Sequence, residues 1–245
     1  MIRLIDITPP VTAASPVFPG DEPFSLRLVE SVSAGAASNV SVVTTSVHNG
    51  AHVDAPLHLY ADAEDIAALP LERFVGPCFV VDLSSGAGVR NAVRFAELPK
   101  SFFRSDGRAR CERLLVKTQR RKPSAWTNDF RALSPEFVEG AAAAGVRFIW
   151  SFAFAANRML LYFLLIGVDV PSVDPAESVE LPAHRAALSK SMPLMENLYL
   201  CDVEAGFYEL IALPMNWPGA EASPVRAVLR PLSDGAAAGS LFYSE

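Results

Sequence analysis

Cysteine is scarce in this chain of 245 residues, which has only three, Cys78, Cys111 and Cys201. They lie far apart, so the sequence contains no Cys-x-x-Cys unit of the kind that binds metal or exchanges disulfides. An odd number of thiols leaves at least one unpaired, which favours a reducing compartment. The amino terminus also lacks the apolar run and small-residue cleavage site of a signal peptide. We therefore expect a cytoplasmic protein.

Positive charge is also in short supply. Lys and Arg number 21 against 27 Asp and Glu, which gives a net charge of −6. This balance argues against a surface that neutralises nucleic-acid phosphates. Hydrophobic residues make up 51% of the chain, enough to exclude wholesale disorder. The expected partner is a small molecule, with neither nucleic acid nor membrane involved.

One long apolar run, Phe148–Ile166, raises the question of a membrane span. Only Ser151 and the pair Asn157-Arg158 interrupt it. An arginine near the middle of a span costs about 2.5 to 3.5 kcal/mol on insertion scales, and no second span accompanies this one. A buried or partner-facing segment is therefore the favoured interpretation.

Local patterns predict strands and helices in a mixed order, without an internal repeat. A helix is expected from Ser134 as N-cap and Pro135 as first residue to Gly145, and another near Pro182. Apolar and β-branched runs predict the strands. These are Leu4–Ile7, two strands between Phe24 and Val47 with Gly35 in their connection, Cys78–Leu83, Leu114–Thr118, one at Val146, Leu198–Cys201, Tyr208–Leu213 and Val225–Leu229. Mixed strands around few helices indicate the α/β class.

Histidine is scarce too, with four residues, yet its distribution is informative. Of four histidines, His48, His52 and His58 fall within eleven residues and enclose Asp54. Imidazole and carboxylate are common ligands of Zn²⁺ and similar ions, so the segment predicts a metal site. The alternative is a set of unrelated polar residues at the end of a strand.

The chain must bend for His48 and His52 to share an ion. On a straight strand their Cα atoms would lie roughly 13 Å apart, from a rise of about 3.3 Å per residue. Asn49-Gly50 is a strong turn signal, and Gly50 can adopt the positive φ that such a bend needs. A helical His-x-x-x-His pair is the alternative, but the preceding β-branched run and Pro56 disfavour it.

The string from His48 to His58, His-Asn-Gly-Ala-His-Val-Asp-Ala-Pro-Leu-His, resembles the signature of the metal-dependent cyclase-like hydrolases, which include bacterial kynurenine formamidases. Further stretches resemble the formamidases in particular, over nearly the whole chain to Pro231. They are Val17–Asp21, Gly76–Cys78, Pro171–Pro175, Leu181–His184, Glu196-Asn197, Tyr208–Pro214 and Ser223–Leu229.

The resemblance implies a site with two metal ions, Zn²⁺ or else Mn²⁺ or another divalent ion. His48 and His52 would hold one ion and His184 the other, with Asp54 and Glu196 shared between them. His58 would be the catalytic acid and base. Phe18, which stands where the formamidases typically carry Trp, would contact the aromatic substrate.

The resemblance also implies a fold and an activity. The expected fold is a single-domain, swivelling β/β/α arrangement of mixed sheets over residues 1–231, usually dimeric, with a loose tail at 232–245. The expected reaction is metal-dependent hydrolysis of N-formyl-L-kynurenine to L-kynurenine and formate, a step of tryptophan degradation. The chain departs from the family at an apolar insertion, about 148–164. A cyclic amide (isatin-like) hydrolase and a catalytically silent metal-binding protein are the alternatives.

Overall fold

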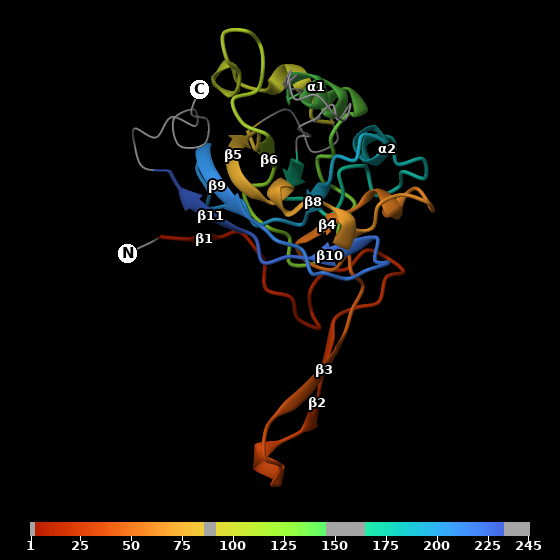
Figure 1. Ribbon diagram of the computed structural model, residues 1–245. Helices are drawn as coiled ribbons and strands as arrows, with labels where there is room; N and C mark the ends of the chain where they lie inside the picture. Colours follow the sequence, from red (N-terminus) through yellow and green to blue (C-terminus); the bar gives the residue numbers. More distant parts are fainter. Residues whose placement is uncertain (1–2, 86–91, 146–164, 233–245) are drawn as a thin grey trace, which may run out of the picture.

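The computed structural model describes residues 3–85, 92–145 and 165–232 (Figure 1). The strand expected at Val146, the apolar insertion at 148–164 and nearly all of the 232–245 tail lie outside the described residues. The domain boundary at residue 231 stays a prediction.

Eleven strands are present in the described ranges, nine of them in one sheet. They are β1 (Ile5–Asp6), β2 (Ser25–Glu30), β3 (Val40–Thr44), β4 (His52–Asp54), β5 (Val75–Asp82), β6 (Arg113–Lys117), β7 (Leu165–Val168), β8 (Leu194–Glu196), β9 (Gly206–Ile211), β10 (Ala222–Pro224) and β11 (Val228–Pro231). The α-helices are α1 (Pro135–Gly145) and α2 (Pro182–Leu188). Short 3₁₀ turns occupy Val32–Ala34, Pro56–His58, Ile66–Ala68, Leu71–Arg73, Phe95–Glu97 and Lys100–Phe102.

The large sheet runs in the order β1-β11-β9-β5-β6-β7-β8-β4-β10. Its centre, from β5 to β8, is parallel, and the strands on either side of this centre pair antiparallel. A mixed sheet with few helices confirms the predicted α/β class. The antiparallel pairing of β4 with β8 matters most for function, because it joins the histidine-rich segment to a distant part of the chain.

Alternating side chains of the central strands bury both faces of the sheet. In β5, Phe79 and Val81 enter one core cluster, and Cys78 and Val80 enter the other. The first cluster also contains Phe137 of α1 and residues of α2, so the two helices cover that face (Figure 1). Because both faces of the sheet are covered, the sequences of the parallel strands are nearly continuous apolar runs.

Helix α1 starts as predicted: Pro135 is its first residue, and Ser134 Oγ accepts a hydrogen bond of 3.0 Å from the backbone N–H of Phe137. Helix α2 starts at Pro182 as predicted, after Leu181 with φ 47°. No helix in the described ranges has the length and hydropathy needed to cross a bilayer.

Strands β2 and β3 form a hairpin that projects from the body of the molecule (Figure 1). Gly35 connects them with φ 92°, as the sequence predicted. Every residue of both strands is exposed. The hairpin therefore exposes several apolar side chains to solvent, among them Leu26, Leu28, Val42 and Val43.

Two predicted strands were misplaced. The run Leu198–Cys201 is not a strand; the ladder instead holds β8, Leu194–Glu196. Asn197, with φ 60°, ends β8, and Leu198 is buried in the core without sheet pairing. The strand predicted over Val225–Leu229 starts too early, because β10 ends at Pro224 and the next strand, β11, starts only at Val228. A buried segment outside the sheet has the same apolar sequence pattern as a buried strand.

Candidate metal centre

The bend expected between His48 and His52 is present. The chain turns after β3, and Gly50 takes φ 72°. A Cβ at Gly50 would lie 2.4 Å from Val11 Cγ2, so the turn also needs glycine for space. His52 then opens β4, and the two imidazole centroids lie 5.1 Å apart. The turn thus brings together two side chains that a straight strand would separate.

Strand pairing brings Glu196 to the same place. In the β4–β8 ladder the Cα partner of His52 is Glu196. Asp54 lies two residues along β4 and so points to the same face as His52. His52 Nε2 lies 3.5 Å from Glu196 Oε2 and 3.5 Å from Asp54 Oδ1. His52 Nδ1 lies 2.9 Å from the Gly50 carbonyl oxygen, which leaves Nε2 as the ligand atom.

His184 reaches the cluster from α2. Its Nε2 lies 3.6 Å from Asp54 Oδ2 and 3.3 Å from Glu196 Oε1. Asp174 orients the ring, because its Oδ2 accepts hydrogen bonds from His184 Nδ1 at 2.8 Å and from the His184 backbone N–H at 2.9 Å. Asp174 Oδ1 also accepts from the Ala183 N–H at 2.9 Å. Sequence reasoning noted Asp174 only within a matching stretch and missed this role.

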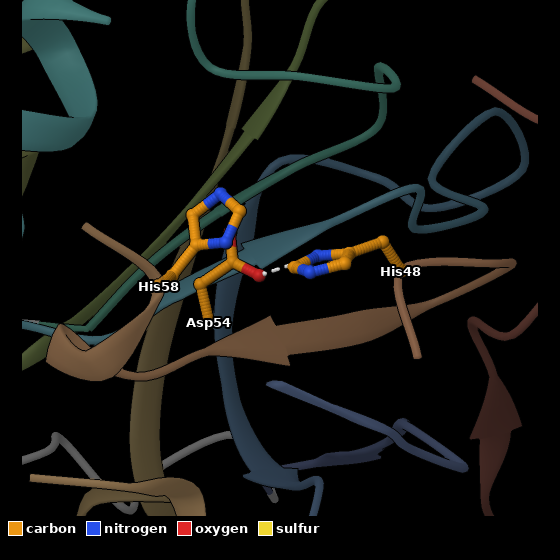
Figure 2. A group of neighbouring side chains, drawn as sticks. All are labelled: His48, Asp54 and His58. Carbon is orange, nitrogen blue, oxygen red and sulfur yellow. Dashed lines mark ion pairs between the residues drawn. The ribbon is translucent and has the colours of Figure 1, made fainter. Parts of the chain in front are cut away.

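His58 ends the 3₁₀ turn Pro56–His58, beside two of the other imidazoles. Its ring centroid lies 4.6 Å from that of His48 and 5.7 Å from that of His184. Figure 2 shows His58, Asp54 and His48 side by side. All four histidines of the chain therefore gather around Asp54 and Glu196.

The charges in this cluster shift one another's titration. Burial opposes ionisation of Asp54, but the neighbouring imidazoles of His52, His184 and His48 hold the pKa of Asp54 well below its usual value. Likewise His184 lowers the pKa of the buried Glu196. Burial acts against His48 as well, yet its contact with Asp54 raises the pKa of His48 to about 9. The pKa of His58, in contrast to that of His48, is lowered, and burial is the main cause.

The residues present fit a divalent cation. Among the described residues, His52 Nε2 and both carboxylate oxygens of Asp54 are buried and have no hydrogen-bond partner. Unsatisfied buried polar atoms are costly, and a bound cation would satisfy all three. Two overlapping groups have ligand atoms within 4.8 Å of one another, and Asp54 belongs to both. They are His48, Asp54 and His58, and His52, Asp54 and Glu196.

The first of these groups includes His58, which the family resemblance assigned to proton transfer rather than to metal. A further residue that sequence reasoning missed is Glu221, whose Oε1 lies 3.3 Å from His48 Nε2. The β4–β10 pairing brings the start of β10 to Asp54, and Glu221 directly precedes β10. No sequence signal near the histidines points to it.

A cavity of about 570 Å³ opens onto the cluster. His48, His52, His58, His184 and Glu196 all line it. Phe18, the predicted substrate contact, also lines this cavity and is 42% exposed. It packs edge-on against Trp126, with ring centroids 5.1 Å apart and planes at 73°. Trp126 was not foreseen, because its loop carries no motif that we could interpret.

Comparison with known proteins places these observations in context. The model of a family described as "Putative cyclase" matches residues 5–175. A kynurenine formamidase from Bordetella petrii is 43% identical over 235 residues, which cover 95% of this chain and 100% of that protein.

Solved structures agree in fold. A predicted metal-dependent hydrolase from Bacillus stearothermophilus superposes with a TM-score of 0.71 at 21% identity, covering 94% of this chain and 98% of that one. Isatin hydrolase A from Labrenzia aggregata, bound to benzyl benzoate, gives a TM-score of 0.73 at 21% identity and covers 93% of both chains.

The role of Asp174 is testable through cation binding. Asp174→Asn retains the shape of the side chain but replaces one acceptor oxygen with a donor, so it can no longer accept from three N–H groups. We expect affinity for Zn²⁺ to fall about 10- to 100-fold, measured by competition with a chromogenic chelator. Asp106→Asn, on an exposed turn, is the matched control. Equal affinity of Asp174→Asn and the unaltered protein would refute an orienting role.

Proposed function

The chain belongs to the putative cyclase family, and from this premise we propose that it is a metal-dependent hydrolase that converts N-formyl-L-kynurenine to L-kynurenine and formate. The observation that carries the proposal is the 43% identity to a kynurenine formamidase across 95% of the chain. The convergence of every histidine on two buried carboxylates supports it independently. In a cell this reaction would be a step of tryptophan degradation.

The proposed cofactor is a pair of divalent ions per subunit, Zn²⁺ or alternatively Mn²⁺. His48 and His52 would hold one ion and His184 the other, and the carboxylates of Asp54 and Glu196 would be shared. When bound, such ions lower the pKa of a water molecule and stabilise negative charge on the formyl oxygen. The buried atoms of His52 and Asp54 that lack hydrogen bonds support this assignment.

His58 is the proposed acid and base. Because burial lowers its pKa, the ring is neutral at pH 7 and can accept a proton from the attacking water. The same ring can then deliver that proton to the aniline nitrogen as the amide C–N bond breaks. Its position beside His48 and His184, at the cavity surface, supports this role.

The aryl ring of the substrate would lie against Phe18 and its edge-on partner Trp126. Both line the cavity that leads to the metal centre. Phe18 retains an aromatic face for stacking but cannot donate a hydrogen bond as an indole would. Two rings in this arrangement leave an apolar wall for an aromatic substrate.

A cyclic amide substrate is the second candidate. The structural similarity to isatin hydrolase A favours it, although at 21% identity the likeness concerns the fold. A catalytically silent metal-binding protein is a third possibility that the same experiment addresses.

An activity panel tests the proposed function. We expect the protein, loaded with Zn²⁺ or Mn²⁺, to hydrolyse N-formyl-L-kynurenine with a kcat/KM at least about 100-fold above that for isatin, and to lose activity after chelation. Hydrolysis is followed by the absorbance of the free arylamine product. Preference for isatin would favour the cyclic amide hydrolase, and bound metal without turnover on either compound would favour the silent protein.

Variants of the histidine segment separate proton transfer from metal binding. His58→Ala should retain its metal and lose about 10²- to 10⁴-fold in kcat, because it removes only the proton carrier. His52→Ala and Asp54→Ala should lose metal as well as turnover. Metal content by mass spectrometry of the purified proteins, beside kcat, distinguishes the classes. Metal loss in His58→Ala would instead make His58 a ligand, and a near-normal kcat would exclude its catalytic role.

We further propose that the protein is a homodimer. The β2–β3 hairpin presents apolar side chains on a projecting two-stranded ribbon, which is marginally stable alone. Burial against a second copy would stabilise it. The three cysteines, all free, are consistent with a cytoplasmic location.

The hairpin allows a direct test of the dimer. The double substitution Leu26→Lys and Val43→Lys places two charges at one rung of the ladder, because these residues are Cα partners. We expect light scattering to give twice the chain mass for the unaltered protein and a shift towards one chain mass for this variant. Leu71→Lys, at another exposed leucine on the body, should leave the mass unchanged. A monomeric unaltered protein would contradict the proposal.

A further inference from the structure

The wall of the cavity also has polar groups that the proposed chemistry does not use. The segment that follows β6 supplies Gln119, Lys122 and Trp126, and the segment that follows β7 supplies Asp169. Among the described lining residues, Lys122 is the single lysine or arginine. This wall therefore has one fixed cation where a substrate could meet it.

Lys122 is held at this wall by backbone carbonyls alone. Its Nζ donates to the oxygens of Asp169 at 3.3 Å, Asn197 at 3.1 Å and Leu198 at 3.2 Å. Charge-assisted hydrogen bonds are typically about 2.7 to 2.9 Å, so these three are long. In the part of the chain that the structure describes, no carboxylate lies within ion-pair distance of Nζ. The three contacts use all three N–H groups of the ammonium, so an incoming carboxylate takes the place of the longest of them, to the Asp169 carbonyl.

The neighbouring carboxylate of Asp169 is already engaged. Its two oxygens accept from the backbone N–H and hydroxyl of Thr118 and from the backbone N–H of Gln119, at 2.8 to 3.0 Å. Burial raises the pKa of Asp169, and burial also lowers the pKa of Lys122 to about 8. The cation is therefore incompletely compensated within the protein.

Gln119 complements the lysine with an acceptor. Its Oε1 is buried and has no hydrogen-bond partner within the described ranges of the chain. Buried side-chain oxygens are rarely left unpaired, so a free acceptor at a cavity wall points to a ligand that donates. A cation and an acceptor, three residues apart on one segment, match the carboxylate and ammonium of a free α-amino acid.

We propose that Lys122 and Gln119 bind the α-amino-acid group of the substrate, Lys122 Nζ contacting its carboxylate and Gln119 Oε1 accepting from its ammonium. The inference rests on the proposed function, since it assigns binding residues to the end of N-formyl-L-kynurenine that does not react. Phe18 and Trp126 contact the aryl ring between the two ends, and the metal centre takes the formamide. The wall then selects amino-acid-bearing formamides over simple formanilides.

A purely structural role for Lys122 makes a different prediction. Its Nζ bonds the carbonyl of Asn197, which directly follows Glu196. If Lys122 only held this loop in place, its loss would disturb the metal centre and lower the turnover of every substrate. Recognition of the amino-acid group affects only substrates that carry it. A neutral substrate without that group therefore separates the two roles.

The experiment compares N-formyl-L-kynurenine with formanilide in the metal-loaded protein. Lys122→Met removes the charge with little change in length, and Gln119→Met removes the acceptor. For Lys122→Met we expect KM for N-formyl-L-kynurenine to rise about 10- to 100-fold with kcat within about threefold, and formanilide turnover to be unchanged. Gln119→Met should raise the same KM about 5- to 10-fold. Lys122→Arg should restore most of the loss.

The controls isolate each assumption. Lys190→Met, at an exposed lysine that contacts only the Ala186 carbonyl in the described structure, should leave both substrates unaffected. Calorimetric binding of the product L-kynurenine should weaken in Lys122→Met by a similar factor. Equal losses on both substrates, or none, would overturn the recognition role while the proposed function stands. An unaltered protein inactive on N-formyl-L-kynurenine would overturn the proposed function itself.

Discussion

The molecule is organised around two carboxylates, Asp54 and Glu196, that the sheet buries side by side. Two like charges in a buried site repel strongly, and the fold must supply positive charge to hold both ionised. Imidazoles lie against both of them: His184 lies within 3.6 Å of both carboxylates and His52 within 3.5 Å. Atoms of His52 and Asp54 still lack hydrogen bonds to any residue that the structure describes, so these residues leave the centre unsatisfied. A cation is the simplest means of completing it.

The topology explains why these groups meet at one edge of the sheet. Strands β6, β7 and β8 are parallel, so their carboxyl ends lie together. Gln119 and Lys122 follow β6, Asp169 follows β7, and Glu196 ends β8. His52 begins the antiparallel β4 and therefore lies at the same edge. Open sheets with parallel strands bind ligands at this end, and here metal centre and recognition wall share it.

Sequence reasoning predicted the part of the site that is local. The cluster of His48, His52, Asp54 and His58 is visible as a motif, and Asn49-Gly50 predicts the bend that brings the first two together. His184 and Glu196 were found only through family resemblance, because their positions depend on strand register and on the start of α2. The helix starts and most strands followed from capping and apolar patterns. Leu198–Cys201 was misread because buried loop residues and strand residues carry the same hydrophobic signal.

The metal centre and the recognition wall of Lys122 and Gln119 place different physical demands on the fold. The metal centre needs several groups held to within fractions of an ångström, and it accordingly uses strands, a helix and the buried orienting carboxylate of Asp174. The neighbouring wall formed by Lys122 and Gln119 needs one cation and one acceptor, which a loop can present once Asp169 has fixed the backbone N–H of Gln119. A fold that separates chemistry from recognition in this way can retain its reaction while the loop after β6 changes the substrate. The choice of substrate therefore depends on the residues of that loop.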